Sequence, residues 1–129
     1  MNDPFARAIV ARICSVILRL NGRSLEAYAE MLRVDPTAFR ALVEQREGAI
    51  DIPLLIDVVS ALVWESAVDP IWLLTGHYDS RTHRQMLLLG EDRSAVGARA
   101  IRAIVWQHFE QLRNSEQWLS APRAVKADH

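Results

Sequence analysis

The sequence lacks the defining features of several large classes of protein. It has a single cysteine, Cys14, so no internal disulfide is possible and a reducing compartment is expected. No uncharged apolar run approaches the roughly 20 residues of a membrane-spanning helix. The N-terminal segment has no signal-peptide pattern, because Asp3 precedes the apolar run and arginines interrupt it. We therefore expect a cytoplasmic protein that does not enter the membrane.

Glycine and proline are also scarce, with five of each among 129 residues. This scarcity, together with few alternating β-branched positions, argues against an all-β fold. Hydrophobic residues make up 50% of the chain, which is enough for a sizeable core and argues against disorder of the whole chain. Apolar residues recur at three- and four-residue spacing, so we predict an all-α protein.

The chain carries no strong excess of charge of either sign. Its formal net charge is −1, and Lys126 is its one lysine, so arginines account for all the other basic residues. A markedly basic chain would point to nucleic acid as a partner. With a balance this close to neutral, the local field of one face decides whether an anionic partner is attracted.

Residues 24 to 45 contain the clearest local pattern. Apolar residues recur at helical spacing up to residue 32. This spacing is interrupted at residues 33 to 35 and resumes at Phe39. Asp35 is a suitable N-cap, and Pro36 fits the first helical position because its missing N–H costs no hydrogen bond there. The pattern predicts two short helices joined by a three-residue turn, which is the outline of a helix-turn-helix.

Further helices are predicted on both sides of this pair. The first covers residues 4 to 20, the fourth opens at Pro53, and a short fifth runs from Asp69 to a stop at Gly76. Beyond a polar connection we predict helices over residues 82 to 89 and 98 to 119, a linker at 91 to 97 and a frayed tail. Residues 1 to 78 are expected to form one domain and residues 79 to 129 a C-terminal helical extension.

The order of these pieces resembles the lambda-repressor-like helix-turn-helix family, the Xre-type regulators. The similarity covers about residues 5 to 78, and it rests on SLEAYAEML at 24 to 32, VD at 34 to 35 and VDPIWLLTG at 68 to 76. It implies a five-helix module followed by C-terminal helices. In such modules the second helix of the pair enters the major groove of DNA, and the first crosses the backbone.

The resemblance implies roles for particular residues. Thr37 and Arg40 match positions that face base edges, and Ser24 matches a phosphate contact at the start of a helix. Arg33 and Arg46 are the flanking arginines expected on phosphates. The implied function is that of a sequence-specific DNA-binding transcriptional regulator, most commonly a repressor, which binds a two-fold-related operator in double-stranded DNA as a homodimer.

Other residues favour a second interpretation, a protein-binding adaptor or anti-regulator that keeps the fold but does not read DNA. Leu25 stands where the family often has Gln, and Ala41 stands where a long polar residue is common. The side chain of Pro36, at the start of the expected reading helix, cannot hydrogen-bond a base. Arg40 itself allows two interpretations: a bidentate contact to guanine, or an exposed ion pair with Glu44 one turn later. Residues 19 to 45 contain four arginines and four acidic residues, so the segment is not strongly basic.

The helix predicted over residues 98 to 119 has more apolar surface than one contact requires. It can fold back on the module or pair with its own copy, and we favour dimerisation. The expected dimerisation residues follow its main apolar stripe: Ile101, Ile104, Val105, His108, Phe109 and Leu112.

No pattern in the chain indicates catalysis or a cofactor. A Ser-His-Asp arrangement, a P-loop and a Gly-rich phosphate motif are all absent. His77, Asp79 and His83 have metal-ligating side chains, but they lie on a polar connection without a cysteine partner or a known metal spacing. We therefore expect neither an enzyme nor a metal site.

Overall fold

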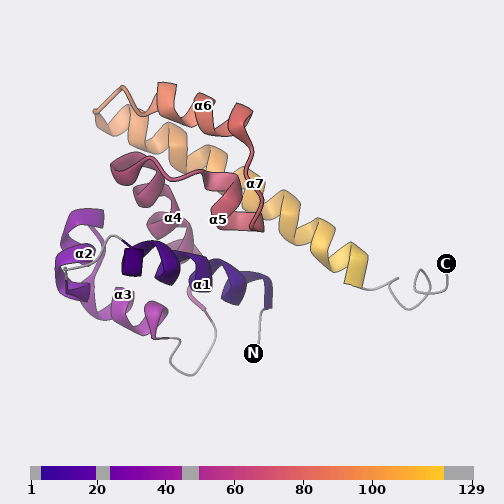
Figure 1. Ribbon diagram of the computed structural model, residues 1–129, viewed down its shortest axis with the longest axis horizontal. Coiled ribbons are helices and arrows are strands. Elements are labelled where there is room, and N and C mark those ends of the chain that lie inside the picture. The colour runs from indigo at the N-terminus through magenta and orange to yellow at the C-terminus, as the bar shows by residue number, and fades with distance from the viewer. Residues whose placement is uncertain (1–3, 20–23, 45–49, 121–129) are drawn as a thin grey trace.

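The computed structural model describes residues 4–19, 24–44 and 50–120, and within these ranges it contains helices and no strand (Figure 1). The all-α prediction is confirmed. In chain order the helices are α1 (Pro4–Arg19), α2 (Leu25–Leu32), α3 (Pro36–Val43), α4 (Ile52–Ser66), α5 (Pro70–Thr75), α6 (Ser80–Leu89) and α7 (Ala95–Ser120).

Short polar residues start most of these helices by capping exposed backbone N–H groups. Each accepts a hydrogen bond from an amide two or three residues later, which satisfies a donor that has no partner inside the helix. Proline follows the cap in α3 and α5 and lies at the second position of α4, where it is compatible with the first turn. The caps are Ser24, Asp35, Asp51, Asp69 and Asp79.

The helix α4 begins at Ile52, one residue before the predicted Pro53, and two further helices begin earlier still for local reasons. The helix α6 begins at Ser80 rather than at residue 82, because the Asp79 carboxylate accepts from the amides of the first turn. The helix α7 begins at Ala95 rather than at residue 98. Its first turn contains Gly97, where a Cβ atom would lie 2.0 Å from the Asp92 carbonyl oxygen. The glycine therefore lets the start of α7 pass directly against the preceding loop.

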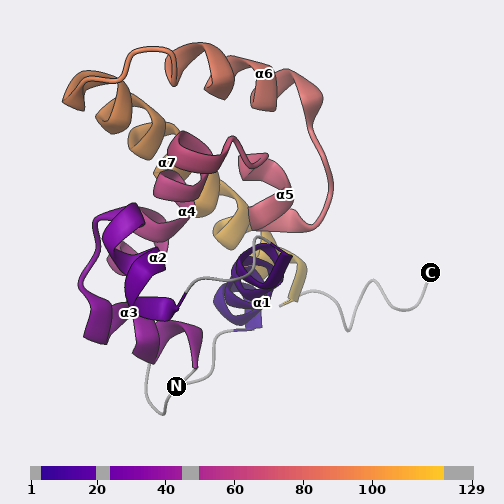
Figure 2. The same ribbon diagram turned by 60° about the vertical axis from the view of Figure 1, so that its left-hand side comes forward.

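The helices are arranged with α4 and α5 in the middle of the molecule. Figures 1 and 2 place α2 and α3 at one end and the α6–α7 pair at the other. The helix α7 packs most extensively on α4, and its C-terminal part passes beside α1, where the rings of Phe109 and Phe5 are 5.4 Å apart. The long helix α7 is thus held by two different parts of the chain.

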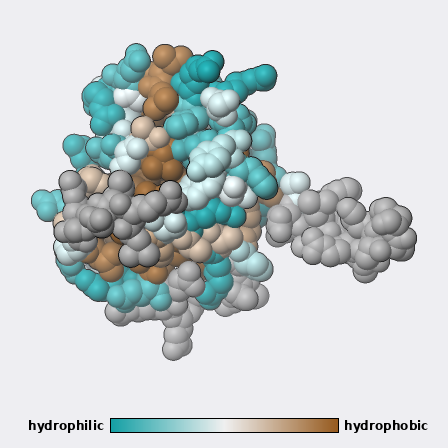
Figure 3. Space-filling view, viewed as in Figure 1, coloured by the Kyte–Doolittle hydropathy of each residue, from teal (hydrophilic) through white to brown (hydrophobic). Residues whose placement is uncertain are grey.

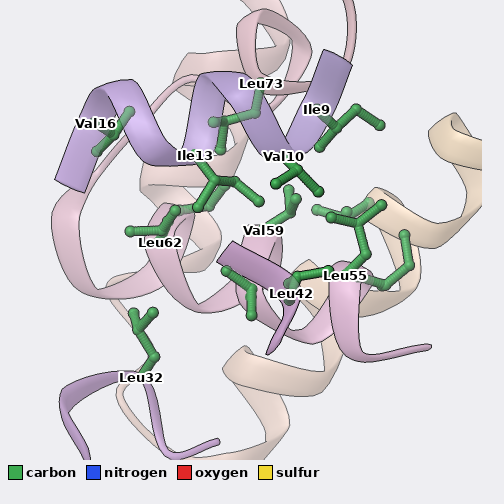
Figure 4. Close-up of a cluster of buried hydrophobic side chains, with 14 of the residues drawn as sticks. Ile9, Val10, Ile13, Val16, Leu32, Leu42, Leu55, Val59, Leu62 and Leu73 are labelled. Carbon is green, nitrogen blue, oxygen red and sulfur yellow. The ribbon is translucent and has the colours of Figure 1, made fainter. Parts of the chain in front are cut away.

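A single hydrophobic core connects all seven helices. Side chains of α1, α3, α4 and α5 meet at its centre, among them Val10, Leu42, Val59 and Leu73 (Figure 4). Buried residues of α6 and α7 belong to the same cluster. The predicted division at residue 78 therefore falls in the connection between α5 and α6 and does not divide the core.

A few large apolar side chains remain at the surface. Leu87 and Leu88 on α6 and Val96 on α7 are exposed, and Figure 3 shows apolar atoms reaching the surface at the end of the molecule where α6 lies. Within the described ranges, no helix combines the length and the apolar character needed to cross a membrane.

Candidate nucleic-acid interface

The connection between α2 and α3 is a tight turn of three residues. Arg33 adopts the left-handed conformation (φ 61°, ψ 43°), and its N–H donates to the Glu30 carbonyl. The next amide, of Val34, donates to the Ala29 carbonyl at 3.0 Å. These bonds satisfy carbonyl groups at the end of α2, and Asp35 then caps α3. The turn therefore holds Arg33 in a conformation that is unfavourable for a non-glycine residue.

The inner faces of α2 and α3 are anchored to α1. Tyr28 is 1% exposed, and its hydroxyl donates to the Ile17 carbonyl at 3.2 Å. Phe39 is fully buried, and the Cys14 thiol contacts the Val43 carbonyl at 3.6 Å. Burial also raises the pKa of the Cys14 thiol, as expected for a structural cysteine. The orientation of α3 is thus set by its apolar side.

The outer side of α3 is open to solvent. Pro36 and Thr37 are exposed, and Arg40 is partly exposed one turn further along. Ser24 is also exposed, and its hydroxyl is engaged as the cap of α2, accepting from the Ala27 amide at 3.1 Å. The four side chains that resemblance assigned to DNA and that lie within the described ranges, those of Ser24, Arg33, Thr37 and Arg40, are therefore all accessible.

Arg40 is held by two carboxylates. Its Nη1 lies 3.0 Å from Glu44 one turn later, which confirms the local pair that the sequence suggested. Its Nη2 also pairs with Glu26, on α2, which the sequence did not indicate. The hydrogen bond from Arg40 lowers the pKa of the Glu26 carboxyl, and the same bond raises the pKa of Arg40. The Arg40–Glu26 pair connects α3 to α2 on their exposed side.

The described residues of the α2–α3 pair include more acidic than basic side chains, whereas residues 19 to 45 as a whole contain four arginines and four acidic residues. Between residues 24 and 44 the acidic side chains are Glu26, Glu30, Asp35 and Glu44, and the basic ones are Arg33 and Arg40. Arg46, the remaining residue assigned to phosphate, lies outside the described residues. Within the described part of the pair, the field is not one that attracts a phosphate backbone at long range.

The structure corrects the dimerisation assignment for half of the α7 residues. Ile101, Val105 and Phe109 are almost completely buried in the chain's own core, so their side chains cannot form the surface of a second copy. The reason is that α7 folds back on α4, and hydrophobic burial is satisfied within one chain. Ile104, His108 and Leu112 flank this buried stripe and are only partly buried.

The possible metal ligands do not converge. His77 is exposed, Asp79 caps α6, and the His83 ring contacts the Ala67 carbonyl through Nε2 at 2.8 Å. Across the ranges that the structure describes, no group of three or more His, Cys, Asp or Glu side chains is arranged to hold a metal ion.

Comparison with known proteins gives no match among family models, curated proteins or solved structures. Function is therefore inferred from the chain's own residues and their geometry.

Proposed function

We propose that this protein is a sequence-specific DNA-binding regulator of the Xre type. It acts as a homodimer and represses transcription. One observation carries the proposal: α3 follows α2 after a three-residue turn, buries its apolar face and leaves its outer face open. This is the arrangement that a helix-turn-helix uses to place its second helix in the major groove. The helices α1, α4 and α5 complete the proposed five-helix module.

In this proposal Thr37 and Arg40 read base edges. The two ion pairs of Arg40 are exposed, and exposed pairs contribute little to stability, so a guanine edge can replace the carboxylates. Before DNA binds, Glu26 on α2 and Glu44 at the end of α3 hold the guanidinium between them. Ser24, Arg33 and Arg46 contact phosphates on either side.

Selection of bound sequences from random DNA at low salt tests the proposal directly. We expect one motif to be enriched, with an affinity that falls steeply as salt increases, because phosphate contacts release counterions. The Arg40→Ala variant should lose about tenfold or more in affinity for that motif and discriminate less at one base pair. Arg84→Ala, which removes an exposed arginine on α6, is the matched control and should bind as the unchanged protein does.

The dimer is tested separately, because an operator with two-fold symmetry requires two copies. Light scattering at micromolar concentration should report twice the mass of one chain, which is 14.6 kDa. The partly buried Ile104, His108 and Leu112 are the members of the assigned stripe that remain accessible on α7. A monomer throughout this concentration range would contradict the homodimer.

The second candidate function is a protein-binding adaptor or anti-regulator. It is favoured by the two carboxylates, of Glu26 and Glu44, that hold Arg40 on the α2–α3 face. Carboxylates beside Arg40 suit a basic protein surface better than a phosphate backbone. Failure to enrich any DNA motif at low salt would reject the regulator and support the adaptor.

A further inference from the structure

A cavity of about 440 Å³ lies where the α2–α3 turn, α4 and the start of α7 meet. Its volume is within the usual range for small-molecule sites in proteins, roughly 300–1,000 Å³. The resemblance to a DNA-binding family did not point to it, because its far wall comes from residues 93 to 102, beyond the matching segment.

Arginine is the most frequent charged residue in the wall of the cavity. Four arginines, Arg33, Arg93, Arg99 and Arg102, line it together with two carboxylates, Asp57 and Glu65, so the wall carries two more positive than negative charges. The chain as a whole has a net charge of −1. Positive charge is therefore concentrated here against the overall balance of the molecule.

Two of the four arginines are already neutralised. Arg102 pairs with Asp57, and the Arg93 guanidinium lies 3.6 Å from the Glu65 carboxylate. Arg33 and Arg99 have no carboxylate partner among the described residues. They come from different elements, Arg33 from the α2–α3 turn and Arg99 from α7, and both line the cavity. The excess positive charge thus comes from two side chains that face the same space from different elements.

The wall of the cavity also includes an indole ring and aliphatic side chains. Trp64 lines it, and the Arg93 guanidinium sits 4.1 Å from the centroid of the indole ring. Leu32 and Ala61 add aliphatic surface. The Trp64 Nε1 is buried and, among the described residues, has no hydrogen-bond acceptor, which is an energetically costly state for an N–H group. The wall therefore combines uncompensated positive charge with aromatic and aliphatic surface.

We propose that this cavity binds a small organic anion, with one carboxylate or phosphate group at Arg33 and Arg99 and a planar apolar body against Trp64. Arginine forms charge-assisted, bidentate hydrogen bonds with both kinds of anion. Because Arg33 is the left-handed residue of the α2–α3 turn, the bound anion contacts the segment that positions α3. This consequence for α3 rests on the proposed function, whereas binding of the anion does not.

The proposal is tested by calorimetric titration of the full chain, without DNA, using three probes of one size class. Phenylacetate carries a carboxylate, phenyl phosphate carries a phosphate, and phenylacetamide is the neutral counterpart of the first. At least one anion should bind in the millimolar range or better, and about tenfold tighter than phenylacetamide, because hydrogen bonds to a charged group are lost in the amide. The stronger of the two anions identifies the preferred acidic group.

Two variants locate the site. Arg99→Gln should weaken binding of the preferred anion about tenfold, since one charge-assisted contact is lost. Arg84→Gln removes the same charge from α6, outside the cavity, and should leave binding unchanged. Circular dichroism of both variants checks that they are folded. The proposal is overturned if neither anion binds in the millimolar range, if phenylacetamide binds equally well, or if the two variants behave alike.

Discussion

Asp69 joins two helices through one buried carboxylate and provides the sharpest test of how this fold is held together. The residue is 4% exposed. Its Oδ1 accepts from the amides of Ile71 and Trp72, at 2.9 and 3.3 Å, and so caps α5. Its Oδ2 accepts from the Asp79 amide at 2.9 Å, ten residues later. The same side chain therefore starts α5 and fixes the backbone that enters α6.

Replacing Asp69 with alanine removes both functions at once. Loss of an N-cap costs about 1 kcal/mol. The Asp79 amide, which is partly buried, would then lose its acceptor, and an unsatisfied buried donor costs about 1–3 kcal/mol. We expect Asp69→Ala to lower the free energy of unfolding by about 2–4 kcal/mol. Asp69→Asn keeps one carbonyl oxygen and should fall between the alanine variant and the unchanged protein.

Asp35→Ala is the matched control, because Asp35 caps α3 from an exposed position through one bond, to the Ala38 amide at 2.8 Å. It should cost only about 1 kcal/mol. Urea denaturation followed by circular dichroism at neutral pH measures both values. Equal losses for Asp69→Ala and Asp35→Ala would refute the reasoning, since the second bond of Asp69 would then contribute nothing.

Three further outcomes are expected. Phe109→Ala should lower the free energy of unfolding by about 3–5 kcal/mol, because its ring is almost fully buried in the core; a loss of no more than about 0.5 kcal/mol, as for a surface position, would contradict this burial. Cys14 should react slowly with iodoacetamide at neutral pH, because burial raises its pKa, and unfolding in urea should accelerate the reaction. Hydrogen bonding to Arg40 lowers the pKa of Glu26 below its ordinary 4.5, so its contribution to stability is present above that pH and lost as pH falls further. Glu26→Gln should flatten this acid dependence of the urea midpoint, and an unchanged acid dependence would contradict the assignment.

The helix ends were largely predictable because their causes are local. Asp35 with Pro36 and Asp69 with Pro70 start helices as expected, and Gly76 ends α5 in the left-handed conformation (φ 87°). The helices α6 and α7 begin earlier than predicted, and the causes of these differences are also local. At α6 the sequence pattern places the capping Asp79 in a polar connection, and at α7 it places Gly97 in a linker.

Only one of the two carboxylate partners of Arg40 could be predicted from the sequence. Glu44 lies four residues away on the same helix, and helical geometry alone brings the two side chains together. Glu26 lies fourteen residues away on α2, and its contact depends on how α2 crosses α3. The local pair was therefore found from spacing, whereas the pair between helices required the tertiary structure.

By itself, the sequence determined that this protein is helical and where most of its helices begin, because capping and helical hydrogen bonds involve residues within about four positions of one another. Only the tertiary structure decided what the apolar stripe of α7 contacts. Burial of apolar surface is not directional, so a stripe that suits a second copy equally suits α4 of the same chain. The cavity between Arg33 and Arg99 was decided in the same way, because it exists only once α7 has folded back beside the α2–α3 turn.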